Sequence, residues 1–147
     1  MAERGATTIW ELWNGDTAEP SMNSGNHVML VGDLNIWLHE YVLGIAPDPA
    51  SPGWKHFLIY PRLIGRLEWA RGWYQSPYGK IECSWLRTAQ KLTVNARVPA
   101  NSTATVYLPA RDPAQVTAPA GAKFRESRGG WLIYDVPSGS FTFSSQS

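Results

Sequence analysis

The sequence predicts a mainly β protein, an antiparallel β-sandwich preceded by an N-terminal α-helical segment. Apolar residues recur with the helical period between residues 23 and 45, and with a period of two in short runs after residue 54. Turn-forming residues separate those runs, which is typical of a sandwich. The length of 147 residues is sufficient for one ordinary domain with a helical appendage.

The helix is expected over residues 23–45. Its apolar stripe has members three and four positions apart: Leu30, Leu34, Trp37, Leu38 and Tyr41. Asn23 or Ser24 can cap its start, and Gly44 stands where a helix commonly ends. Further apolar residues extend around the circumference: Val28, Met29, Val31, Ile36 and Val42. A helix that is apolar on nearly every side is expected to be buried in a larger structure.

Residues 47–53 contain three prolines and one glycine, so we expect a short stiff linker there. The linker therefore separates two expected domains, residues 1–45 and residues 46–147. Seven strands are expected after the linker, at residues 55–60, 67–75, 80–87, 91–97, 104–108, 131–136 and 140–144. Residues 111–122 are rich in Pro and Ala, which predicts a long surface loop.

Composition excludes several classes of protein. Hydrophobic residues make up 44% of the chain and charged residues 17%, which is typical of a globular protein. The formal net charge of +1 gives no reason to expect nucleic acid, and no apolar run has the length of a membrane span. No signal peptide is visible, and the compartment stays open.

Charge is divided unevenly along the chain. Residues 1–45 contain one basic and six acidic residues, and residues 46–147 contain twelve basic and six acidic ones. Such an asymmetry indicates two parts with different surroundings, although two solvated surfaces that differ by chance are about equally compatible with it.

The first candidate for chemistry is Glu11, in the sequence Thr-Thr-Ile-Trp-Glu-Leu-Trp at residues 7–13. Trp10 and Trp13 flank this carboxylate, and burial against indole would favour its protonated form, as proton transfer near neutral pH requires. Indole faces also suit the apolar faces of sugar rings. The sequence alone favours the simpler alternative, an ordinary glutamate on a surface turn.

The second candidate is the polar cluster at residues 21–27, which ends in Asn26 and His27. The backbone N–H groups at the start of a helix can orient hydroxyl or anionic groups of a ligand. The pattern itself favours a helix cap followed by a hydrogen-bonded histidine.

Other features give weaker signals. The three histidines, His27, His39 and His56, show no spacing typical of metal ligands, so we expect no metal and no cofactor. Cys83 lies in an apolar run and is expected to be a buried small side chain. Five of the eight tryptophans could form a sugar-binding platform, although core positions are the commoner outcome: Trp54, Trp69, Trp73, Trp85 and Trp131.

Several ordered motifs together resemble a known family. Residues 5–13 resemble a signature near the C-terminal end of the catalytic barrel in bacterial α-L-rhamnosidases, glycoside hydrolase family 78. The resemblance continues through residues 21–27, 37–45, 52–57, 67–71, 76–81 and 100–106. It implies an α/α-barrel followed by a C-terminal β-sandwich, with residues 1–45 as the last barrel segment and its final helix.

The resemblance also implies roles for the candidate residues. Glu11 matches the general base that activates water in an inverting hydrolysis of terminal α-L-rhamnosyl bonds. His27 matches a residue that lines the rhamnose pocket, and Trp10, Trp13 and Asn26 are assigned to the same site. An inverting glycosidase also needs a general acid. In the family that acid comes from an earlier barrel motif with no match in this sequence, so the chain is expected to be an inactive C-terminal fragment.

Two alternatives remain open. The chain can be a stand-alone carbohydrate-binding or structural β-sandwich module. It can also self-associate through its apolar helix, because large uncovered apolar patches mark interfaces. The residues expected to be buried by self-association are Leu34, Trp37, Leu38 and Tyr41.

Overall fold

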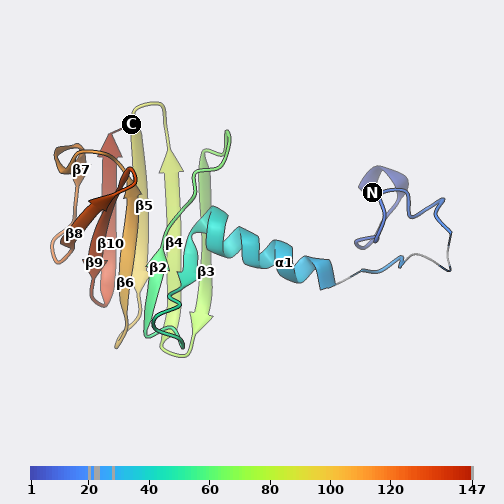
Figure 1. Ribbon diagram of the computed structural model, residues 1–147, viewed down its shortest axis with the longest axis horizontal. Coiled ribbons are helices and arrows are strands. Elements are labelled where there is room, and N and C mark those ends of the chain that lie inside the picture. The colour runs from blue at the N-terminus through green and yellow to red at the C-terminus, as the bar shows by residue number, and fades with distance from the viewer. Residues whose placement is uncertain (20, 22–23, 28, 147) are drawn as a thin grey trace. The chain divides into compact units, whose positions relative to one another are not determined.

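The computed structural model describes residues 1–19, 21, 24–27 and 29–146. The chain forms two compact units, Met1–Trp37 and Leu38–Ser147 (Figure 1). The first contains a short 3-10 turn, η1 (Ala2–Arg4), extended and turning segments, and the helix α1 (Met29–Trp37). The second is a β-sandwich that begins with the π-helical segment η2 (Leu38–Leu43).

The described helix begins later than the sequence predicts. Residues 24–27 are not helical, so the expected cap role of Ser24 is wrong, and Asn23 lies outside the described residues. Gly44 ends the helical segment as predicted, with a positive φ of 91°. Leu34, Trp37, Leu38 and Tyr41 are exposed on the helical segments, which also contain the polar residues Asp33, Asn35, His39 and Glu40. Their role in self-association stays a prediction.

In the described part of the chain, ten strands form two sheets, which confirms the predicted β-sandwich. The first sheet has the order β1-β2-β6-β9-β8 and the second the order β3-β4-β5-β10-β7. Their bounds are Ile45–Pro47 (β1), His56–Ile59 (β2), Trp69–Ser76 (β3), Gly79–Arg87 (β4), Lys91–Val98 (β5), Thr103–Pro109 (β6), Val116–Thr117 (β7), Lys123–Arg128 (β8), Trp131–Val136 (β9) and Gly139–Gln146 (β10). All pairings are antiparallel except that of β2 with β6, which is parallel.

The core lies between the two sheets and follows the alternation of each strand. On β5, Leu92, Val94 and Ala96 are buried while the residues between them face outward. The largest buried side chains come from both sheets: Trp85, Phe57 and Phe143. Cys83 is buried in the same core, as predicted.

The structure contains elements that the sequence analysis did not predict. Residues 111–122 are not a continuous loop, because they include the 3-10 turn η3 (Pro113–Gln115) and the short strand β7. The edge strand β8 was also missed. Pro47 closes strand β1, so residues 48–55 connect two strands of one sheet.

Main-chain carbonyl groups at and just after the end of segment η2 accept hydrogen bonds from the sandwich. The buried indole of Trp85 donates from Nε1 to the Val42 carbonyl at 2.8 Å, and the Cys83 thiol donates to the Leu43 carbonyl at 3.3 Å. The Tyr60 amide donates to the Gly44 carbonyl at 2.7 Å. Residues 42–44 are therefore part of the packing of the sandwich, and the predicted domain boundary after residue 45 stays a proposal.

Among the described residues, no helix combines the length and the apolar character needed to cross a membrane.

Candidate functional site

The two motifs predicted to carry chemistry lie against each other in the first unit. The Glu11 amide donates to the Ser24 carbonyl at 3.1 Å, and the His27 amide donates to the Ile9 carbonyl at 2.7 Å. These main-chain bonds join residues 9–11 to residues 24–27, although a dozen positions separate them in the sequence. Both segments are predicted to carry chemistry, and these bonds bring them together in one cluster.

The Glu11 carboxylate is held at one of its two oxygens. Oε2 accepts the Ser24 amide at 2.9 Å and lies 3.6 Å from Nδ1 of His27. The other oxygen, Oε1, has no hydrogen bond to any described residue. Among the described residues, the carboxylate is thus held at Oε2 and has no hydrogen-bond partner at Oε1.

His27 is more enclosed than Glu11. Its side chain is 22% exposed, and Nδ1 is buried without a hydrogen-bond partner among the described residues. A buried polar atom of this kind is uncommon, because leaving it unsatisfied costs free energy. The Glu11 oxygen is the polar group that the structure places in front of it.

Glu11 is not buried between the two tryptophans. Its side chain is 41% exposed, which differs from burial against indole and agrees with the surface position that the sequence alone favours. Trp10 instead packs on Gly15, where a Cβ atom would lie 2.8 Å from the indole carbons Cγ and Cδ2. Trp13 is 80% exposed. Both indoles belong to the same unit as Glu11, but they do not enclose it.

Asn26 takes part in the same site through its side chain. Thr8 Oγ1 donates to Asn26 Oδ1 at 2.6 Å, which fixes the orientation of the amide. The Asn26 backbone amide lies 3.3 Å from Ser24 Oγ, which accepts its hydrogen bond. Glu11, Asn26 and His27 therefore belong to one hydrogen-bonded cluster, and their roles toward a substrate remain predictions.

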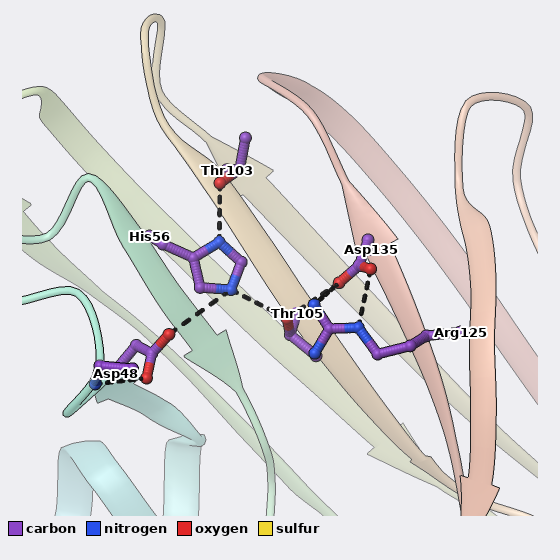
Figure 2. Close-up of polar contacts among 7 residues, drawn as sticks. Asp48, His56, Thr103, Thr105, Arg125 and Asp135 are labelled. Atoms are coloured by element: carbon purple, nitrogen blue, oxygen red, sulfur yellow. Dashed lines mark hydrogen bonds and ion pairs between the residues drawn. The ribbon is translucent and has the colours of Figure 1, made fainter.

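A second polar cluster in the sandwich was missed from the sequence (Figure 2). His56 on β2 contacts two hydroxyls of β6, with 2.7 Å from Nδ1 to Thr103 Oγ1 and 2.9 Å from Nε2 to Thr105 Oγ1. Thr105 donates to Asp135 Oδ1 at 3.0 Å, and Arg125 pairs with the same carboxylate at 2.6 Å. We call these residues the His56 cluster.

The His56 cluster joins four neighbouring strands of the first sheet. Arg125 reaches it because β8 has a bulge between Phe124 and Glu126, and a bulge redirects the side chain of the extra residue. Both ring nitrogens of His56 and both Asp135 oxygens already have partners, so the cluster is suited to holding strands together. The sequence shows that Thr103 and Thr105, two positions apart, can point to the same face of a strand. It does not show that β6 pairs with β2 in parallel, which is what brings them to His56.

The tryptophans of the predicted platform are in different environments. Trp85 is in the core, and Trp54 stacks on Tyr74 with ring centroids 4.2 Å apart. Trp131 is half-buried against Tyr60. Trp69 and Trp73 are exposed on the same strand, β3. Two of the five thus keep the exposure that a platform needs.

Comparison with known proteins identifies the relatives of this chain. Residues 44–123 match the model of the bacterial alpha-L-rhamnosidase C-terminal domain, and residues 1–42 match that of the bacterial alpha-L-rhamnosidase 6 hairpin glycosidase domain. An alpha-L-rhamnosidase of Streptomyces avermitilis is 33% identical over 97% of this chain. An alpha-L-rhamnosidase of Alteromonas sp. (strain LOR) is 38% identical over 72% of it.

Solved structures agree with this relationship. The crystal structure of the Streptomyces avermitilis alpha-L-rhamnosidase complexed with L-rhamnose superposes with a TM-score of 0.86 and 31% identity over 97% of this chain. That of the alpha-L-rhamnosidase from Dictyoglumus thermophilum gives a TM-score of 0.83 with 28% identity over 100% of this chain. The chain spans 14% and 17% of those two chains, and 14% and 12% of the two relatives matched by sequence.

The chain therefore belongs to the bacterial alpha-L-rhamnosidase C-terminal domain family and is homologous to the C-terminal part of those enzymes.

Proposed function

We propose that this chain acts as the C-terminal part of an inverting α-L-rhamnosidase and that Glu11 is its general base. The observation that carries the proposal is the carboxylate of Glu11, fixed at Oε2 by the Ser24 amide and without a hydrogen-bond partner at Oε1 among the described residues. The homology to alpha-L-rhamnosidases supports the substrate class, a terminal α-L-rhamnosyl residue.

In this mechanism, Oε1 of Glu11 accepts a proton from a water molecule as that water attacks the anomeric carbon of rhamnose. The C–O bond to the leaving group breaks at the same time, and a general acid protonates the leaving oxygen. The two carboxyl groups stand about 6.5–9.5 Å apart in inverting enzymes, which leaves room for the water. A fixed base lowers the barrier because its orientation is set before the reaction.

The neighbours of Glu11 have supporting roles in the proposal. His27 keeps the carboxylate oriented and contributes to the rhamnose pocket. Asn26 presents a polar edge that Thr8 already orients. Trp10 and Trp13 supply apolar surface for the sugar ring.

We further propose that these 147 residues alone do not hydrolyse rhamnosides. The family resemblance assigns the general acid to an earlier barrel segment, and no motif of this chain corresponds to it. An isolated base without its acid loses the leaving-group protonation that the mechanism requires.

The experiment uses two proteins. The purified chain is expected to release no p-nitrophenol from p-nitrophenyl α-L-rhamnoside. The second protein is the Streptomyces avermitilis enzyme in which this chain replaces the homologous C-terminal part. This chimera is expected to be active, to form β-L-rhamnose first by proton NMR, and to lose at least about a thousandfold in kcat on Glu11→Gln.

Azide provides the decisive control in the chimera. If Glu11 activates water, then azide, which needs no base, restores turnover of the Glu11→Gln variant and yields a rhamnosyl azide. Thr17→Ala, in the same unit but outside the cluster, is expected to keep full activity. A Glu11→Gln chimera that retains its activity would refute the role of Glu11, and turnover by the chain alone would refute its inactivity.

A further inference from the structure

The outward surface of the second sheet carries two exposed indoles on its edge strand. Trp69, Arg71 and Trp73 on β3 face away from the core, with exposures of 63% and 54% for the two tryptophans. Ala70 and Tyr74, on the same strand, pack against the core instead. The indoles lie four residues apart, or about 13 Å along a strand. We call this surface the Trp69 face.

Polar side chains continue the Trp69 face across β4, β5 and β10. Strand register places Arg71 beside Ser84, Ser84 beside Asn95, and Asn95 beside Thr142. Asn95 Nδ2 donates to Ser84 Oγ at 3.2 Å, and Thr142 Oγ1 donates to Asn95 Oδ1 at 2.8 Å. These hydrogen bonds hold the polar groups in place before any ligand binds.

The Trp69 face is hollowed and carries an excess of positive charge. A cavity of about 910 Å³ is lined by both indoles and by four charged residues, Arg71, Lys80, Glu82 and Arg97. Glu82 pairs with Lys80 at 2.6 Å and with Arg97 at 3.5 Å, and the hydrogen bond from Lys80 keeps the pKa of this carboxyl below its ordinary value. The Arg71 guanidinium has no hydrogen bond or ion pair with any described residue. The Arg71 guanidinium thus has no counter-ion among the described residues, and Arg71 lies between the two tryptophans on β3.

We propose that the Trp69 face is a binding site for an oligosaccharide that carries carboxylate groups, separate from the Glu11 site. Indoles present flat apolar surfaces to sugar rings, while fixed amides and hydroxyls exchange hydrogen bonds with sugar hydroxyls. Arg71 can bind a carboxylate in a bidentate manner. The separation of the two indoles suits a chain of several sugar units rather than one monosaccharide.

Other occupants fit these observations less well. A stable interface between two copies of the chain needs an apolar centre, whereas the centre of this face is a row of polar side chains. Single-stranded nucleic acid also stacks on aromatic residues, but it binds chiefly through its bases and phosphate charges. The fixed row of Ser84, Asn95 and Thr142 instead offers hydrogen-bonding partners to the many hydroxyls of a sugar chain.

The test titrates the full chain with an oligogalacturonate and follows tryptophan fluorescence and heat. Saturable binding is expected, and Trp69→Ala and Trp73→Ala are each expected to weaken it about tenfold or more. Arg71→Gln is expected to weaken binding of the acidic oligomer but not of the same oligomer with its carboxyl groups reduced. Phe124→Ala, which removes an exposed aromatic side chain of β8 in the other sheet, is the matched control and should leave the affinity unchanged.

Several outcomes would overturn the proposal. These are the absence of saturable binding, equal affinity for the carboxyl-reduced oligomer, and equal affinity for a single-stranded oligonucleotide. Concentration-dependent association of the chain that is abolished by Trp69→Ala would assign the face to a second copy instead. Circular dichroism and the urea midpoint of each variant separate lost binding from lost folding. The result is independent of Glu11, because the titration does not use turnover.

Discussion

Nδ1 of His27 lies 3.6 Å from Oε2 of Glu11, just beyond hydrogen-bonding distance, and the same oxygen accepts the Ser24 amide. The main-chain bonds between residues 9–11 and 24–27 hold this arrangement. The carboxylate thus links the two motifs as well as being the candidate base. Its structural contribution can be measured separately from any catalytic one.

Glu11→Ala is expected to release the Ser24 amide. The variant removes the acceptor, so amide hydrogen exchange at Ser24 should become faster, by an amount equivalent to about 0.5–1.5 kcal/mol of local stability. Glu11→Gln keeps a carbonyl oxygen as acceptor and should retain most of the protection. NMR-detected exchange checks both variants, and equal exchange rates in wild type and Glu11→Ala would contradict the observed contact.

The sequence predicts a strand correctly where buried apolar residues alternate with exposed polar ones. Strand β5 was predicted because Leu92, Val94 and Ala96 alternate with polar residues, and the same side chains fill the core. Strand β8 was missed because nearly all its residues are exposed at a sheet edge, which leaves no alternation to detect. The pairing of β2 with β6 joins segments far apart in the sequence, and no local pattern encodes it.

The candidate site was predictable in its parts but not in its assembly. Glu11 and His27 were singled out by residue type and family resemblance, whereas their approach depends on main-chain bonds between two irregular segments. The Glu11 side chain is 41% exposed, and Trp10 packs on Gly15. Ser24 was expected to cap a helix, and instead its amide binds the carboxylate.

Trp85→Phe is expected to destabilise the sandwich by about 2–4 kcal/mol, because it leaves the buried Val42 carbonyl without its donor and opens a cavity. Urea unfolding monitored by circular dichroism measures the change. Trp73→Phe is the matched control, since the exposed indole of Trp73 makes no such bond, and its effect should stay within about 0.5 kcal/mol. Equal effects of the two substitutions would contradict the anchoring role of Trp85.

Gly44→Ala is expected to be strongly destabilising. Gly44 has a φ of 91°, and a Cβ atom there would collide with the backbone of Tyr60 and Pro61. Gly65→Ala is the control, because Gly65 also has a positive φ but has open space around its missing Cβ. The Gly65 variant should lose only about 1–2 kcal/mol from backbone strain. If thermal unfolding shows that Gly44→Ala is at least as stable as Gly65→Ala, the close approach of Gly44 to the backbone of Tyr60 and Pro61 does not make the substitution destabilising.

The Cys83 thiol is expected to make stability fall at alkaline pH. Burial raises the pKa of Cys83 from 9.0 to about 12, so the folded state keeps a proton that the unfolded state loses. The stability that the buried, protonated thiol contributes is fully present below pH 9. It is lost as pH rises toward 12, by about 1.4 kcal/mol per pH unit.

Cys83→Ala isolates this contribution from those of other groups. The difference in unfolding free energy between wild type and Cys83→Ala should be constant below about pH 9. Above about pH 9, the wild type should lose stability relative to Cys83→Ala. Urea unfolding across the alkaline range measures this difference. A pH-independent difference would contradict the burial of the thiol.

The exposed apolar helical residues are expected to drive self-association of the isolated chain. Leu34 and Trp37 on α1, and Leu38 and Tyr41 on η2, are all exposed, and exposed apolar surface of this kind favours burial against another surface. Sedimentation velocity should reveal a dimer or larger species at high concentration, and Leu34→Lys should shift it toward monomer. Leu86→Lys is the control, because Leu86 is a similarly exposed leucine on β4, and it should leave the association unchanged. A wild-type chain that sediments as a monomer at every concentration would refute self-association through these residues.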